Sequence, residues 1–259
     1  GADIITASAG TSNFRAGVNA GNSIASGGTG NVAVGDEAGT AITTGDYNTA
    51  LGFYALYTED TASKSTAVGT SALQVQNAGT VDAFNTAVGF AAGVAVTTGT
   101  NNTLIGGLSG DALTTGTHNV AVGYGSLSTD TAGKFSVAVG GGALELQNFT
   151  SATNAYNTGV GWLAGNAVTT GIQNTLIGGL AGDALTTSSR NVALGYAALS
   201  NESLGQYSTA IGYLALGSQS NTSNAATYNT AVGYAAGAVI STGSQNTMIG
   251  GLAGDATTT

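Results

Sequence analysis

The chain offers few side chains that could carry out catalysis. It contains one histidine, His118, and no cysteine, so a Ser-His-Asp set or a zinc site would need ligands from another subunit. The adjacent carboxylates Glu59 and Asp60 follow a short apolar segment and read as solvated turn residues rather than as the facing acids of a glycosidase. We therefore expect neither an enzyme nor a cofactor.

An acidic motif that resembles a calcium-binding repeat occurs three times, as GGLSGDAL at 106–113, GGLAGDAL at 178–185 and GGLAGDAT at 250–257. Its fourth residue is Ser or Ala where the calcium nonapeptide has Gly, and its copies are far apart in the chain instead of in adjacent turns. Hard cations need about six or more oxygen ligands. Asp111, Asp183 and Asp255 are therefore weak metal candidates, and we expect them to be turn residues.

The elements that must position any site follow from an internal repeat. Segments of the form N-T-A-V-G-x-x-A-G-x-x-x-T-T-G-x-x start at 31, 48, 65, 85, 102, 119, 136, 157, 174, 191, 208, 229 and 246. Nine of the twelve intervals between these starts equal 17, and the units that start at 65, 136 and 208 have lengths of 20, 21 and 21. The long units create a super-repeat of about 72 residues, with equivalent starts at 85, 157 and 229. Positions within a unit are numbered from its first residue, so Asn31 is at position 1 and Tyr47 at position 17. The last residue of a long unit, such as Tyr156 or Tyr228, is also called position 17, because it too directly precedes position 1 of the next unit.

The repeat covers nearly the whole chain. Residues 13–30 form one more, degenerate unit, so we expect a single repeat domain over 13–259 after a lead-in over 1–12. The chain begins without Met and stops inside a unit, and we expect it to be a fragment of a longer protein.

Each unit predicts one short strand. Position 5 is Gly in all thirteen units, which suits a corner, and position 4 is always Val, Ile or Leu. Such short strands cannot bury themselves alone, but stacked units share backbone hydrogen bonds and form side-chain ladders, including one of Asn at position 1. The fold class is therefore all-β, a parallel β-solenoid or β-roll of about 14 coils of mostly 17 residues.

Period-two alternation separates the two faces of each strand. We expect positions 2 and 4, such as Thr86 and Val88, to fill the coil interior. The opposite face would then carry Ala and Gly, with Leu104, Leu176 and Met248, and this apolar strip would be covered in a homotrimer. A monomeric solenoid remains the alternative if that strip faces inward.

Position 17 carries a second ladder, which includes several aromatic residues. A flat ring with polar neighbours can stack on a sugar, so the candidate receptor-binding residues are Phe135, Tyr156, Tyr207, Tyr228 and Arg190. The opposing interpretation is that these rings cap the corners of the coil or pack between subunits, because large aromatic surfaces are usually buried.

Composition excludes several classes of protein. Gly accounts for 43 of 259 residues without a three-residue period, and Pro is absent, which excludes collagen. A hydrophobic content of 42% argues against disorder. The net charge is −9 with only four cationic residues, so we expect no nucleic-acid partner. No apolar run approaches the roughly 20 residues that span a bilayer, so we expect no membrane insertion.

The units resemble those of known fibres. The N-[ST]-x-[VI]-G segments look like head repeats of trimeric autotransporter adhesins, which form a left-handed β-roll. The phrases NVAVGDEAGTAITTGDYNTALG and NTLIGGLAGDALTTG look closer still to repeat regions in tail fibres of marine bacteriophages, including cyanophages. The resemblance implies a homotrimeric fibre located outside the cell, on a virion tail or a cell surface.

Three functions follow as hypotheses. The chain could be a structural shaft or head that presents a host-attachment tip, or a segment that itself binds a host-surface glycan or protein receptor. The long units predict loops suited to such binding, namely QVQNAGTVDAF, ELQNFTSATNAY and GSQSNTSNAATY. The third hypothesis is a hydrolase of surface polysaccharide, which would require clustered acidic residues in a groove. The alternative to a fibre is a monomeric solenoid such as an ice-binding or calcium-binding surface protein, although the paired Thr at positions 13 and 14 are interrupted within each super-repeat.

Overall fold

The computed structural model describes residues 9–256 and is a parallel β-solenoid without helices over that range, which confirms the predicted fold class. One repeat unit forms one turn, giving about 14 turns of about 17 residues each. The chain divides into two compact halves, residues 1–124 and 125–259, which are described separately and called the first and the second half. Residues 1–8 of the predicted lead-in lie outside the described range, and Thr11 already bridges to Thr29.

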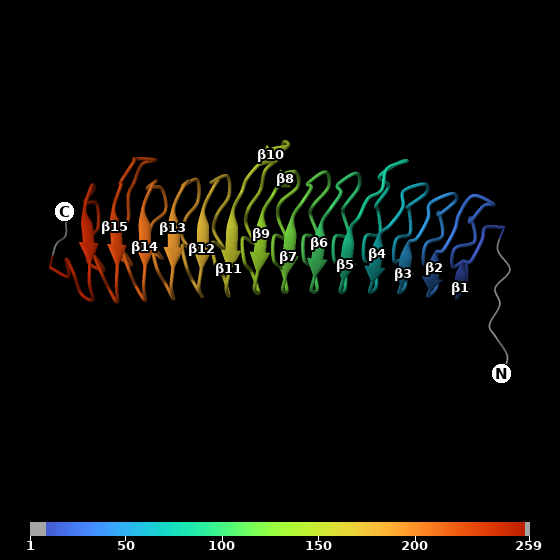
Figure 1. Cartoon of the computed structure of the whole chain (residues 1–259), viewed down its shortest axis with the longest axis horizontal. Coiled ribbons are helices and arrows are strands. Elements are labelled where there is room, and N and C mark those ends of the chain that lie inside the picture. The colour runs from blue at the N-terminus through green and yellow to red at the C-terminus, as the bar shows by residue number, and fades with distance from the viewer. Residues whose placement is uncertain (1–8, 257–259) are drawn as a thin grey trace. The chain divides into compact units, whose positions relative to one another are not determined.

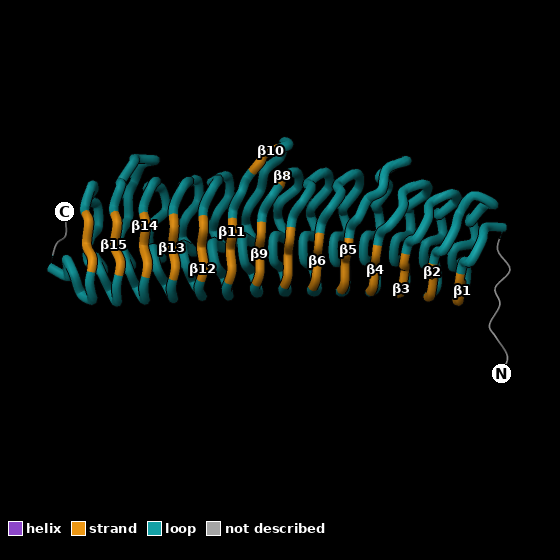
Figure 2. Tube along the Cα trace, viewed as in Figure 1, coloured by secondary structure: helices purple, strands orange, loops and turns teal. Residues whose placement is uncertain are grey.

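Strands take up only a short part of each turn (Figures 1 and 2). In the first half the strands are β1 (Phe14–Ala16), β2 (Val32–Val34), β3 (Thr49–Leu51), β4 (Thr66–Val68), β5 (Thr86–Val88), β6 (Thr103–Ile105) and β7 (Val120–Val122). In the second they are β9 (Val137–Val139), β11 (Thr158–Val160), β12 (Thr175–Ile177), β13 (Val192–Leu194), β14 (Thr209–Ile211), β15 (Thr230–Val232) and β16 (Thr247–Ile249). A further pair, β8 (Gly133–Lys134) and β10 (Thr153–Asn154), joins a loop to the preceding turn.

Successive strands pair in parallel and without offset. Thr49 lies beside Thr66, and Leu51 lies beside Val68. The glycine at position 5 ends each strand, as Gly52 shows with a φ of 134°. A Cβ atom on Gly52 would lie 2.6 Å from the carbonyl group of Gly69 in the next turn. The position therefore requires Gly both for its backbone angle and for the close approach of the next turn.

The predicted inward and outward faces of the strands are reversed. Position 3 faces the interior, so Leu104 and Leu176 are completely buried and Met248 is 8% exposed. Positions 2 and 4 face outward: Thr86 and Val88 are half-buried, and Leu51 is 44% exposed. The alternation itself was predicted correctly. Its phase was wrong because position 3 is Ala or Gly in most turns, which fits a narrow coil, while the Val, Ile and Leu residues of position 4 lie outside. Leu104 and Leu176 are accommodated at position 3 because Gly stands at position 9 beside them.

Side-chain volume is balanced across the interior of each turn. Where position 3 is Leu104, Cβ atoms added to Gly93 and Gly110 at position 9 would lie 2.6 and 2.7 Å from its methyl groups. Where position 3 is Ala, as in Ala50, a buried leucine such as Leu56 can occupy position 9. The turns that start at 31, 85, 102, 157, 174 and 229 have Gly at position 9 and instead bury an aliphatic residue at position 12. The largest fully buried side chains are Ile42, Leu56, Leu73, Leu104, Leu113, Leu127, Leu144, Leu176, Leu185, Leu199, Leu216 and Ile240.

The asparagine ladder at position 1 bonds mainly to the backbone. Oδ1 of Asn31 accepts a hydrogen bond from the backbone N–H of Asn48 at 2.9 Å. Nδ2 of Asn48 donates to the carbonyl of Ala62, in its own turn, also at 2.9 Å. Each buried amide thus ties one turn to the next and closes its own turn, which satisfies polar groups that would otherwise be costly to bury.

Three buried polar clusters mark the long turns. In the first, Nε2 of Gln76 donates to Glu59 and to the hydroxyl of Ser65, both at 2.8 Å, and its Oε1 accepts from Asn85. Glu59 is fully buried, so its prediction as a solvated residue was wrong. We call these sets the acid–Gln clusters; the other two are Asp130 with Ser136, Gln147 and Asn157, and Glu202 with Ser208, Gln219 and Asn229.

The inward orientation of position 3 can be tested with neighbouring residues of one strand. We expect Leu104→Ala to lower the free energy of unfolding by about 2–5 kcal/mol, because it opens a cavity in a packed interior. Ile105→Ala, at a site that is 39% exposed in a single chain, should cost about 1 kcal/mol or less at a protein concentration low enough to keep the chain monomeric. Denaturation followed by circular dichroism measures both, and a larger loss for Ile105→Ala would contradict the assignment.

The Asp130 cluster predicts a pH dependence. Burial raises the pKa of the Asp130 carboxyl, in opposition to its hydrogen bonds from Gln147 and backbone N–H groups. A folded pKa above the unfolded one means that the linked stability is greatest below the unfolded pKa and declines as pH rises through the folded value.

The free energy of unfolding of the wild type, relative to the non-titrating variant Asp130→Asn, should therefore fall with rising pH over the range above the ordinary aspartate pKa of about 4. Urea titrations at a series of pH values provide the measurement. A difference between the two proteins that stays constant over this range would show that burial does not perturb the carboxyl.

Candidate functional site

The predicted receptor-binding residues lie on the outer corner of position 17. Phe135, Tyr156, Arg190, Tyr207 and Tyr228 all have positive φ angles, between 50° and 63°, immediately before the buried residue of position 1. The four rings are between 37% and 54% exposed. The corner therefore turns each of these side chains away from the core.

The structure brings these five residues together in two groups. The rings of Phe135 and Tyr156 stack with centroids 5.2 Å apart and planes at 11°. Tyr207 and Tyr228 also stack at 5.2 Å, at an angle of 23°. The guanidinium of Arg190 lies 5.4 Å from the centre of the Tyr207 ring.

Stacking changes what the rings can bind. A sugar packs on the flat face of an aromatic ring, and within each group the neighbouring turn already occupies one face. Tyr207 has Arg190 on its ring as well as Tyr228. The stacked faces are therefore closed to a sugar, while the ring edges and the tyrosine hydroxyl groups are not part of these stacking contacts. This geometry favours the interpretation that the position 17 ladder stabilises the corners of the coil.

Sequence reasoning missed a second aromatic column, at position 6. Tyr196, Tyr213 and Tyr234 stack in succession, with centroids 5.6 and 5.5 Å apart. Their exposed fractions are 51%, 46% and 60%, and Trp162, at the same position, is 62% exposed. The signal was present in the sequence, since an aromatic residue follows the invariant Gly of position 5 at 53, 90, 124, 162, 196, 213 and 234.

Position 6 directly follows strands whose outward residues are uncharged. The outward residues of the strands are Thr or Val at position 2 and Val, Ile or Leu at position 4. Ile105 in the first half and Ile177 and Leu194 in the second half are 37–43% exposed. We call these outward residues of positions 2 and 4 the outer sheet face. A continuous apolar surface of this kind is typical of an interaction site.

The weak metal candidates lie at position 10 and do not gather acidic partners. Burial raises the pKa of the Asp111 and Asp183 carboxyls, and Oδ1 of each is buried without a hydrogen bond. Asp255 is exposed. Within residues 9–256, no three His, Cys, Asp or Glu side chains lie close enough to hold a metal ion.

Comparison with protein-family models, with curated proteins and with solved structures found no match to this chain. Within residues 9–256 no helix has the length and hydrophobicity to cross a membrane. The class that the geometry defines is a β-solenoid repeat protein.

A double-mutant cycle tests whether the position 17 rings bind one another. We expect Tyr207→Ala and Tyr228→Ala to show a coupling free energy of about 0.5–1.5 kcal/mol, as for stacked aromatic pairs. The pair Tyr156 and Tyr207 is the control, because these residues are three turns, or about 14 Å, apart. Equal coupling in both pairs, measured by urea denaturation, would show that stacking contributes nothing.

Proposed function

We propose that this chain is a structural segment of an extracellular attachment fibre, on a phage tail or a cell surface, in which three copies associate in parallel. The observation that supports this proposal is the outer sheet face. In the thirteen units that start at 31 to 246, positions 2 and 4 hold only Thr, Val, Ile and Leu, although the chain as a whole carries a net charge of −9.

This face has the chemistry of an interface core. Interface cores are depleted of charged residues and enriched in aromatic ones, and the column of Tyr196, Tyr213 and Tyr234 adjoins the outer sheet face. Parallel copies around a three-fold axis would cover the strip along the solenoid. The Ala and Gly strip that the sequence suggests as the trimer interface is buried inside the coil, and the outer sheet face is the exposed apolar strip in its place.

The proposed role is structural and not catalytic. The same order of short and long turns recurs in each super-repeat, as a shaft requires, and the loops of the long turns depart most from the repeat. Lys64, the last residue of the preceding turn, forms a salt bridge at 2.5 Å with Asp82 in the first of these loops. Contact with a host-surface glycan or protein receptor is assigned in this proposal to such loops, since rigid scaffolds commonly present binding residues on loops.

One observation favours a second candidate, a monomeric ice-binding protein. Four consecutive turns of the first half carry Thr at position 2, namely Thr49, Thr66, Thr86 and Thr103. All four side chains face outward. A regular row of hydroxyl and methyl groups on an in-register sheet could order water. This function requires the outer sheet face to remain exposed, so the two candidates make opposite predictions about assembly.

Light scattering of the purified chain tests the proposal. We expect a mass three times the 24.9 kDa of one chain. Ile211→Lys should reduce that mass to one chain while the β signal in circular dichroism persists, because a lysine on this face would be desolvated in the interface. Ser128→Lys, at position 10, is the control and should remain trimeric.

The single tryptophan reports on the same event, because Trp162 adjoins the outer sheet face at position 6. Its emission should lie at longer wavelength in Ile211→Lys than in the wild type. A folded wild-type monomer would overturn the fibre proposal. In that case, inhibition of ice recrystallisation by the monomer would support the second candidate.

A further inference from the structure

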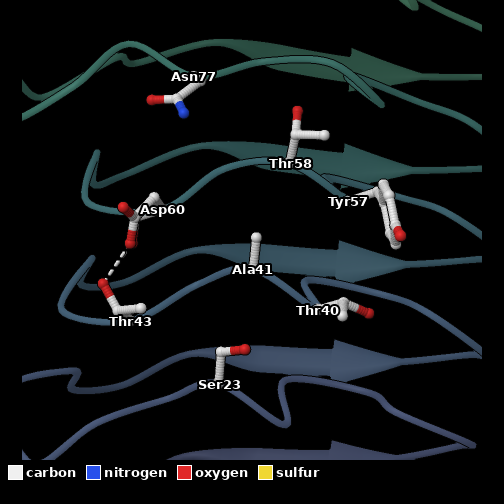
Figure 3. Close-up of a pocket in the computed structure, with 8 residues that line it drawn as sticks. All are labelled: Ser23, Thr40, Ala41, Thr43, Tyr57, Thr58, Asp60 and Asn77. Carbon is white, nitrogen blue, oxygen red and sulfur yellow. Dashed lines mark hydrogen bonds between the residues drawn. The ribbon is translucent and has the colours of Figure 1, made fainter.

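The first half of the chain contains a groove whose residues are not among the site residues predicted from the sequence. It has a volume of about 510 Å³ and is lined by Ser23, Thr40, Ala41, Thr43, Tyr57, Thr58, Asp60 and Asn77 (Figure 3). The volume falls in the range of roughly 300–1,000 Å³ that is typical of small-molecule sites. From residue 31 onward the lining belongs to positions 10, 11 and 13, and none of it belongs to a strand. The groove therefore does not include the outer sheet face.

The groove has two flanks of different chemistry. Figure 3 shows Thr43, Asp60 and Asn77 along one side, Thr40 and Tyr57 along the other, and Ser23, Ala41 and Thr58 between them. One flank therefore carries a carboxylate and an amide, and the other carries an aromatic ring. The strip between them is made of small side chains.

Hydrogen bonds fix the polar groups of the groove. The Thr43 hydroxyl donates to Oδ1 of Asp60, and the Thr58 hydroxyl lies 3.1 Å from the carbonyls of both Gln74 and Gln76. Because these hydroxyl protons are already used, the oxygens are left to accept hydrogen bonds. A carboxylate offers about four acceptor sites, so Asp60 can accept further donors beside Thr43.

The aromatic ring of the groove differs from those of the ladders. Tyr57 is held by a T-shaped contact with Tyr54, with centroids 4.8 Å apart. At position 10 the adjacent turns carry Thr40 and Gln74, which are not aromatic. No aromatic side chain at the same position can therefore stack on Tyr57 from above or below, unlike Tyr213, which has a ring on either side.

The other super-repeats show that the groove residues are not imposed by the fold. The equivalents of Tyr57 are Ser128 and Ser200, and the equivalents of Asp60 are Thr131 and Ser203. The same turn geometry thus forms without the ring and the carboxylate. Their joint presence in one super-repeat marks a local specialisation.

We propose that this groove binds a neutral saccharide, with the Tyr57 ring against an apolar face of the sugar and Asp60 and Asn77 accepting and donating hydrogen bonds to its hydroxyl groups. A polyhydroxylated ligand supplies the donors that the fixed acceptors of the groove require. The carboxylate of Asp60, on a chain of net charge −9, disfavours acidic sugars. The proposal goes beyond the structural role above and stands on the groove alone.

Saturation-transfer NMR and calorimetry on the full chain test the proposal. The probes are maltotriose, cellotriose and chitotriose, with sialyllactose as an acidic comparison. We expect at least one neutral probe to bind, and Asp60→Thr and Tyr57→Ser each to weaken that binding by about tenfold or more. Both variants introduce residue types that this chain already uses at the equivalent positions, so they should fold.

Tyr47→Ser is the matched control, since it removes a tyrosine that is 61% exposed and lies outside both the groove and the outer sheet face, and it should leave the affinity unchanged. No binding of any neutral probe at about 10 mM, or equal binding by both groove variants, would overturn the proposal. The fibre proposal fails or survives separately, because light scattering measures assembly without any saccharide.

Discussion

The distance between successive turns is the constraint on which the rest of this structure depends. Parallel strands in register lie about 4.8 Å apart, and each turn must place the same backbone atoms at that spacing. At the corner of position 5 this leaves no room for a side chain, since a Cβ atom on Gly52 would lie 2.6 Å from the carbonyl group of Gly69. Extra residues can enter only where a loop can leave the stack, as in the turns that begin at Ser65, Ser136 and Ser208.

The interior obeys a second rule, which is conservation of volume within a fixed cross-section. In the twelve units that start at 31 to 229, position 9 is either Gly, accompanied by an aliphatic residue at position 12, or Leu, accompanied by an acid or Gln at position 12. Gly110 with Leu113 and Leu127 with Asp130 are examples of the two arrangements. Dense packing explains the exchange, because a protein interior tolerates neither a void nor an extra side chain. The acid or Gln at position 12 is hydrogen-bonded within an acid–Gln cluster.

The sequence predicts the repeat, the strand positions and the corner glycines because each depends on local backbone requirements. Alternation along the strand also follows from the sequence, but it only sorts side chains into two sets. The assignment of Leu104 to the interior depends on its contacts with Gly93 and Gly110. That exchange between positions 3 and 9 was visible in the sequence, although only a known turn shape gives it meaning. Residues of the position 17 ladder could be named, but their stacking depends on side-chain geometry.

The groove around Asp60 was beyond sequence reasoning for a different reason. Its residues come from four turns and share no motif, and they stand out only where the super-repeats differ. Glu59 beside it looked like the second member of a solvated acidic pair. It is instead fully buried, with Gln76 of the next turn as its partner.

The acid–Gln clusters have a consequence for how such a chain finds its native alignment. Near-identical turns could stack with a slip of one turn, which would preserve most strand pairing and most of the apolar contacts. A slip that placed Glu59 beside Val96 in place of Gln76 would bury a carboxylate against an aliphatic residue, at a cost of several kcal/mol. Each super-repeat therefore carries one pairing that identifies the correct neighbour, and a uniform solenoid gains a means of rejecting misaligned folding intermediates.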